Sequence, residues 1–127
     1  MQEYMLHIRN QGEHVSTLSP EKHEQFLKAC EDYISNLKKN GNLIAAQPIA
    51  REGVMLSGTP GNWKTGPYNE NKEVQVGYYH IRAHNLDEAV ELAKGNPEFA
   101  YTDTARVEVR PLKTKEASTG FEYPTEG

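Results

Sequence analysis

The chain has 127 residues, 25% charged and 36% hydrophobic, so we expect one globular domain around one core rather than a disordered chain. The net charge is -4 and no basic run exceeds Lys38-Lys39, which argues against nonspecific nucleic-acid binding. A single cysteine, Cys30, excludes an internal disulfide and a multi-cysteine metal site. The polar start MQEYMLHIRN contains no signal peptide or membrane-spanning run, so we expect a cytoplasmic protein with no membrane partner.

The first third of the chain predicts a strand followed by a long helix. Residues Glu3–Arg9 alternate between two faces, as a strand does. Ser19-Pro20-Glu21 is typical of a helix start, with a serine cap, proline in the first position and an acid near the positive end of the dipole. The helix should end near Lys38-Lys39, with Gly41 just beyond it. Its apolar stripe has helical spacing and comprises Phe26, Leu27, Cys30, Tyr33, Ile34 and Leu37.

The middle of the chain predicts further strands separated by turns. Leu43–Ile49 reads as a strand. Val54–Leu56 followed by the turn-forming Ser57–Asn62 fits a small hairpin and an excursion over the domain equally well. Gly66-Pro67 predicts a turn into a polar loop, after which Val74–Arg82 is rich in β-branched and aromatic residues and predicts a strand.

The last third predicts a second helix, a closing strand and a tail. Asn85 can cap a helix whose third residue is Glu88, and Gly95-Asn96-Pro97 should stop that helix. Thr104–Leu112 alternates like a strand. We therefore expect a domain over residues 1–112 and a C-terminal tail, Lys113–Gly127, ordered only where its two aromatic residues dock.

The order strand, helix, strand, strand, helix, strand predicts an α+β, ferredoxin-like βαββαβ fold, with both helices on one face of an antiparallel sheet. The residues expected to face the helices are Leu6, Ile8, Tyr79, Ile81, Val107 and Val109. The opposite face should carry Met5, His7, Arg9, Tyr78, His80, Arg82, Arg106, Glu108 and Arg110. Because Tyr and Met are costly to leave together in water, we expect this face to pair with a second copy in a homodimer, with a polar-lined cavity between the copies.

The candidate catalytic residues are His7 and His80, which could act as acid and base near neutral pH if their strands are neighbours. The candidate ligand-binding residues are Arg9, Tyr68, Lys72, Glu73, Tyr78 and Glu108. An anion would be bound by Arg9 and Lys72, and a pocket near His7 could have Lys72 or Tyr68 as its lid. The structural alternatives are ordinary surface histidines and an exposed Lys-Glu pair. We expect no metal and no other cofactor, because no His-x-His or His-x-x-x-His spacing is present, and we read Cys30 as an inert core thiol.

The central stretch also resembles a known signature. It reads Thr65-Gly66-Pro67-Tyr68, Asn69, Glu70, Asn71, Lys72-Glu73, then Gly77-Tyr78-Tyr79. This resembles the YCII-related family in its DGPF-motif branch, and the resemblance extends roughly from Glu3 to Leu112, with Thr65 where the motif has Asp. It implies a dimeric α+β barrel. Some relatives in the wider YCII group carry a histidine on the first helix, paired with an aspartate as a proposed catalytic dyad. The place of that histidine falls near Cys30, so the dyad does not carry over to this chain.

Two functions fit these observations. One is binding of a small, possibly anionic molecule in a cavity, with cofactor-free acid-base chemistry of an isomerase or lyase kind. The other is a non-catalytic ligand-binding, accessory or regulatory dimer, since no nucleophile–base or phosphate-loop motif is present. A purely structural dimer is a third possibility if side chains fill the cavity.

Overall fold

The computed structural model describes residues 1–11 and 17–124. Parts of the predicted polar loop, residues 12–16, and of the tail, residues 125–127, lie outside the described residues. The main elements are β1 (Gln2–Gln11), α1 (Pro20–Lys39), β2 (Leu43–Pro48), β3 (Val54–Thr59), β4 (Asn62–Pro67), β5 (Glu73–Ala83), α2 (Leu86–Lys94), the one-turn α3 (Glu98–Tyr101) and β6 (Arg106–Pro111).

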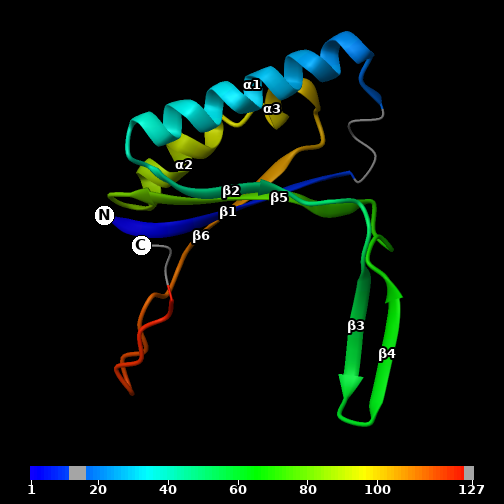
Figure 1. Cartoon of the computed structure of the whole chain (residues 1–127), viewed down its shortest axis with the longest axis vertical. Coiled ribbons are helices and arrows are strands. Elements are labelled where there is room, and N and C mark those ends of the chain that lie inside the picture. Colours follow the sequence, from blue (N-terminus) through cyan, green and yellow to red (C-terminus); the bar gives the residue numbers. More distant parts are fainter. Residues whose placement is uncertain (12–16, 125–127) are drawn as a thin grey trace.

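The main sheet has the strand order β2-β5-β1-β6, and each neighbouring pair is antiparallel. Figure 1 shows α1, α2 and α3 together on one face of this sheet. The arrangement confirms the predicted ferredoxin-like α+β fold. The four strands of the βαββαβ order are, in chain order, β1, β2, β5 and β6.

The helix ends form where the sequence predicts them. The Lys22 N–H donates to Ser19 Oγ at 3.2 Å, and the Glu88 N–H donates to Asn85 Oδ1 at 2.8 Å. Gly41 has φ 76°, a conformation that glycine adopts without a Cβ clash just past a helix end. These local contacts fix where each helix starts and stops.

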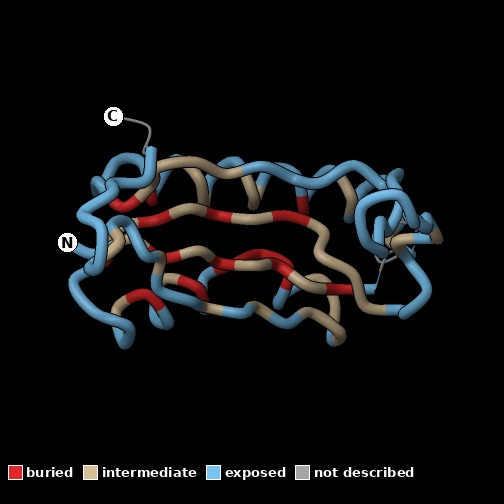
Figure 2. The backbone as a smooth tube through the Cα atoms, turned by 90° about the horizontal axis from the view of Figure 1, so that it is seen from below, coloured by how far each residue is buried: buried red, intermediate tan, exposed pale blue. Residues whose placement is uncertain are grey.

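The core lies between the sheet and the helices. The buried sheet residues that face the helices include Tyr4, Leu6, Ile8, Tyr79, Ile81 and Ala83. Phe26, Leu37, Ala89 and Ala93 of the helices are buried as well. Figure 2 shows the resulting alternation of buried and half-buried positions along the strands. The two sheet faces therefore divide as the alternation predicts, and we call the face without helices the open face.

The hairpin β3–β4 decides between the two readings of Val54–Asn62, because it is an exposed arm rather than a cover over the domain. It projects from the side of the sheet opposite the helices (Figure 1). The prediction of a turn at Gly66-Pro67 is wrong: both residues lie within β4, and the turn follows at residues 68–72. Pro67 is tolerated there because it ends an edge strand of a two-stranded sheet.

The described part of the tail folds back on itself instead of lying flat on the domain. Lys115 and Glu122 form an isolated antiparallel bridge, and the Tyr123 N–H donates to the Thr114 carbonyl at 2.9 Å. The rings of Phe121 and Tyr123 pack edge to face with centroids 5.1 Å apart, and both side chains remain exposed. The two aromatic residues thus order the tail mainly against each other.

Candidate functional site

The open face brings several predicted residues side by side. His7 lies directly opposite Tyr78 on β5 and opposite Glu108 on β6. Directly opposite residues on one face have Cβ atoms about 5 Å apart, so these three side chains are neighbours. Glu108 is exposed, and its Oε2 lies 4.0 Å from Arg110 Nη1.

His80 has a carboxylate partner on the same face. It lies opposite Met5, one diagonal step from His7. Its Nε2 is 2.7 Å from Glu3 Oε1, and the exposed fractions of the two side chains are 17% and 20%. Glu3 is not among the site residues predicted from the sequence. The structure thus places the two histidines near each other but gives His80 a separate acidic neighbour.

Glu73 joins the open face through a break in the strand alternation. The register between β1 and β5 shifts so that Ile8 pairs with Gly77 while Arg9 pairs with Gln75. The extra residue in β5 reverses which side chains face out, so Glu73 reaches the face that carries Arg9. Its carboxylate accepts from Arg106 at 2.8 and 2.9 Å and from Arg9 at 3.0 Å.

These contacts have an electrostatic consequence at the same end of the sheet. Hydrogen bonds from Arg106 and then from Arg9 hold the pKa of Glu73 below its usual value. Lys72 is exposed and lines a hollow that also includes Asp103 and Arg106. Tyr68 is half-buried in the turn after β4. Lys72 and Tyr68 thus lie at the hairpin end of the sheet, whereas His80 pairs near the start of β1.

A pocket lies on the other side of the sheet, between α1, β2, β5 and the segment that leads into α3. We call it the α1 pocket; its volume is about 280 Å³. Its apolar lining includes Ile8, Phe26, Leu27, Ile34, Ala46 and Val76. Its more polar lining includes Cys30, Glu31, Gln47, Tyr79, Asn96 and Glu98. Neither predicted catalytic histidine lines this pocket.

Small residues on the helix-facing side of the sheet leave the room for this pocket. Ala46 of β2 lies opposite Tyr79, and Gly77 of β5 lies opposite Pro48. A Cβ on Gly77 would lie 3.1 Å from the Gln47 carbonyl oxygen, so the strand pairing leaves little room for a side chain at this position. The pocket is therefore a consequence of side-chain size at two strand positions.

The pocket residues Cys30 and Tyr79 keep their protons at neutral pH. Burial, followed by the nearby charges of Glu98 and Glu31, raises the pKa of Cys30 to about 11. Burial is also the main cause that raises the pKa of Tyr79. A protonated thiol is a poor nucleophile, which supports the prediction of an unreactive thiol. The prediction that Cys30 lies in the core is wrong, because the residue is half-buried and lines the α1 pocket.

Asn96 and Glu98 form the polar end of the α1 pocket, and both are buried, with exposed fractions of 3% and 7%. The Glu98 N–H donates to Asn96 Oδ1 at 2.9 Å, which fixes the orientation of the amide. Within the described residues, Asn96 Nδ2 is buried and has no hydrogen-bond partner. Such a group is costly to leave unpaired, and other atoms of Asn96 line the α1 pocket.

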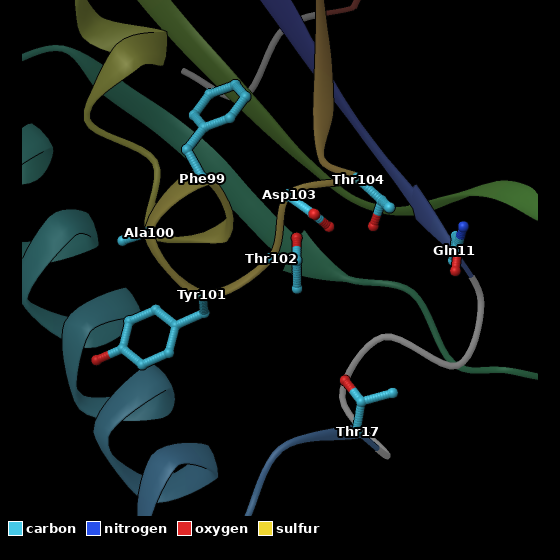
Figure 3. A pocket seen from close by; sticks show the side chains of 8 residues that line it. All are labelled: Gln11, Thr17, Phe99, Ala100, Tyr101, Thr102, Asp103 and Thr104. Atoms are coloured by element: carbon cyan, nitrogen blue, oxygen red, sulfur yellow. The ribbon is translucent and has the colours of Figure 1, made fainter.

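Asn10 connects the Glu98 carboxylate to a second hollow. Its Nδ2 donates to Glu98 Oε2 at 2.7 Å and to Thr102 Oγ1 at 2.9 Å, while Thr104 Oγ1 donates to its Oδ1 at 2.6 Å. Thr102 and Thr104 line an open, polar hollow of about 640 Å³ beside the end of β1 (Figure 3). The buried Asn10 network thus separates an apolar pocket from a polar one.

Asn10, Asn96 and Glu98 are not among the residues predicted from the sequence. Asn96 and Glu98 lie around Pro97 in a segment that resembles a helix stop, and Asn10 lies at the end of an alternating strand. Their roles arise from a contact between residues 88 positions apart, for which the sequence contains no periodic signal.

The described residues contain no group of three His, Cys, Asp or Glu side chains arranged to hold a metal ion. Among the described helices, none has the length and apolar character needed to cross a membrane.

No curated protein compared with the chain matches it. The family model described as the YCII-related domain matches residues 2–113, nearly the whole domain and the first residue of the tail. The chain therefore belongs to the YCII-related family.

Proposed function

We propose that this chain binds a small, largely apolar molecule in the α1 pocket. The observation that carries the proposal is the mainly apolar cavity of about 280 Å³, with the buried residues Asn96 and Glu98 in its lining. An apolar cavity with a few convergent polar groups is the usual form of a small-molecule site. Its volume is at the lower end of the range for ligand pockets, which favours a small ligand.

The charges around the pocket favour an uncharged ligand with a hydrogen-bond acceptor. The lining groups that can donate are the Cys30 thiol and the Tyr79 hydroxyl. The negative charge of Glu98 raises the pKa of both Cys30 and Tyr79, so its field opposes a bound anion as well. A carbonyl compound with an aliphatic or aromatic body satisfies these requirements. The anionic ligand that the sequence suggests fits the arginines of the open face better.

If the pocket also carries out acid-base chemistry, Glu98 is the residue suited to move the proton. It is a buried carboxylate of the lining, held in place by Asn10, whereas the Cys30 thiol and the Tyr79 hydroxyl are protonated at neutral pH. A positioned carboxylate next to a bound carbonyl compound can remove a proton from the adjacent carbon, the first step of an isomerisation or elimination. The competing proposal is a non-catalytic binding protein that uses the same pocket.

The test is to fill the pocket and measure binding. Ala46→Leu adds volume on the pocket floor, and Ala29→Leu makes the same change on α1 outside the pocket lining. Small ketones and amides would be screened by ligand-observed NMR against both variants and the unmodified chain. We expect Ala46→Leu alone to abolish binding. Equal binding by all three proteins would refute the site.

A second variant separates catalysis from binding. Glu98→Gln keeps the size of the side chain but removes the carboxylate. For a bound carbonyl compound, solvent deuterium exchange at the adjacent carbon reports proton removal. If Glu98→Gln still binds the compound but no longer catalyses the exchange, the result supports acid-base catalysis by Glu98. Absence of exchange by the unmodified protein, with binding intact, supports the non-catalytic protein.

We also propose that the chain is a homodimer formed through the open face. The face carries Met5 and Tyr78, both half-buried, among charged residues, and no described helix covers it (Figure 1). A stable interface of this kind should bury more than about 1,000 Å² in total. Sedimentation equilibrium at micromolar concentration tests this proposal, and a monomer at all concentrations would refute it.

The open face is the second candidate site. The observation that favours it is the register that places His7 between Tyr78 and Glu108, which a second copy would enclose. Acid-base chemistry by His7 and His80 predicts that replacing both with Gln abolishes exchange while Glu98→Gln does not. The two candidate sites therefore give opposite results in the same assay.

Within the family, we assign the chain to the DGPF-motif branch. The support is the Gly66-Pro67-Tyr68 element with Lys72-Glu73 after it. Thr65 replaces the aspartate of that motif and lies on the exposed strand β4, so no role that requires a carboxylate there applies to this chain.

A further inference from the structure

The hairpin β3–β4 has one apolar and one polar face. In its register, Val54 pairs with Pro67, Leu56 with Thr65, and Gly58 with Trp63. Paired residues share a face, so these pairs form a surface that we call the hairpin's apolar face. The other face carries Ser57, Lys64, Thr59 and Asn62, together with Met55 and Gly66. This amphipathic pattern is that of a sheet with one face covered by another layer.

The apolar face is nevertheless uncovered by the described part of the single chain. The exposed fractions are 68% for Val54, 61% for Leu56 and 59% for Trp63. A two-stranded hairpin is marginal by itself in water, because it buries too little apolar surface. The apolar face therefore requires a partner that the described part of one chain does not supply.

The hairpin's position indicates where that partner lies. It extends to the same side as the open face, at one end of the sheet, while the tail extends to that side at the other end (Figures 1 and 2). Phe121 and Tyr123 of the tail are also exposed. A molecule that packs on the open face would therefore lie between two projections that both carry exposed apolar side chains.

The charges on the open face favour a second copy as that molecule. Glu3 lies opposite Arg82 at one end of strands β1 and β5, whereas Arg9 and Glu73 lie at the other end and form an ion pair. β1 and β5 thus each have an acid at one end and a base at the other, while β6 carries Arg106 and Arg110 near its two ends. A two-fold axis in the plane between facing sheets, either along or across the strands, brings each acid opposite a base of the other copy.

We propose that the hairpin's apolar face packs on a second copy of this chain and is a second contact of the homodimer, beyond the sheets themselves. The inference rests on the proposed homodimer and goes beyond it, because the sheets could pair while the hairpins remain in water. Burial of Val54, Leu56 and Trp63 by the partner explains why an exposed arm retains an apolar face.

The first test uses the unmodified chain, in which Trp63 is the only tryptophan. Sedimentation equilibrium identifies the concentrations at which the chain is dimeric and monomeric. Acrylamide quenching of tryptophan fluorescence is then measured at both. We expect quenching to be at least threefold weaker in the dimer, because the partner covers Trp63.

The second test uses matched substitutions on the two faces of β3. We expect Leu56→Lys, on the apolar face, to raise the dimer dissociation constant at least tenfold, and Ser57→Lys, on the polar face, to change it less than twofold. A dimer in which Trp63 is quenched as in the monomer and Leu56→Lys has no effect would overturn the hairpin contact and leave the homodimer intact. A monomer at all concentrations would refute the homodimer and the hairpin contact with it.

Discussion

Removal of the Asn10 side chain should be strongly destabilising, although Asn10 lies outside the hydrophobic core. Asn10 is fully buried, and its amide makes side-chain hydrogen bonds with Glu98, Thr102 and Thr104. Asn10→Ala removes all of them and leaves the buried Glu98 carboxylate without one of its donors. The hydrogen bonds of Asn10 therefore connect the end of β1 to α3 and to the segment that leads into β6.

The magnitude follows from the number and kind of these bonds. A hydrogen bond to a charged group contributes about 1.5–3 kcal/mol and a neutral one about 0.5–1.5 kcal/mol. Loss of one bond to a carboxylate and two to threonine hydroxyls should therefore lower the free energy of unfolding by roughly 3–5 kcal/mol. Thr104→Val removes one neutral bond with little change in shape and should cost about 1 kcal/mol.

Urea unfolding followed by far-UV circular dichroism measures both effects, at one fixed protein concentration because association would also stabilise the fold. Asn69→Ala, in the exposed turn after β4, is the matched control and should change stability by less than about 0.5 kcal/mol. If Asn10→Ala loses no more stability than this control, the network does not hold the fold together and the reasoning is wrong. A larger loss for Thr104→Val than for Asn10→Ala would also contradict it.

Three other predictions follow from local geometry. Ser19→Ala removes the cap of α1 and should cost about 1 kcal/mol, whereas Ser35→Ala on the exposed surface of the same helix should not, as thermal unfolding would show. Because burial raises the pKa of Cys30 from 9.0 to about 11, alkylation by iodoacetamide should stay slow below pH 9. Rapid alkylation near neutral pH would contradict this prediction. The free energy of unfolding should fall as pH rises from 9.0 to about 11, because the thiol of the unfolded chain loses its proton first. The Arg106 contact lowers the pKa of Glu73, so this carboxylate should stabilise the fold above its ordinary pKa and lose that effect as pH falls through the lowered value. Arg106→Gln should raise the Glu73 pKa in an NMR titration, and an unchanged value would exclude the contact in solution.

The site could be predicted only in part. Alternation along the strands places His7, Tyr78 and Glu108 on one face, and the register confirms that they are neighbours. The same alternation would place Glu73 on the helix side, because a count in steps of two from Tyr78 does not include the extra residue near Val76. The bulge moves Glu73 to the open face, where it meets the arginines.

The sequence by itself determined the elements whose causes are local. The Ser19 cap, the apolar stripe of α1 and the alternation in β1 depend on neighbours a few residues away, so they can be identified from spacing and residue type. The order of these elements then restricts the topology to the ferredoxin-like arrangement, since right-handed crossovers leave few alternatives. The YCII-related family also follows from the sequence, because the family model matches residues 2–113.

Only the tertiary structure decided the α1 pocket, the Asn10–Glu98 contact and the direction of the hairpin. Each depends on residues far apart in sequence: the pocket on Ala46 and Gly77 beneath α1, the contact on positions 88 residues apart. Burial of a polar residue such as Glu98 is not encoded by its own neighbours, because it is tolerated only where a distant donor satisfies it. A hairpin's register likewise fixes its two faces but not the direction in which it projects, which depends on the packing of the whole domain.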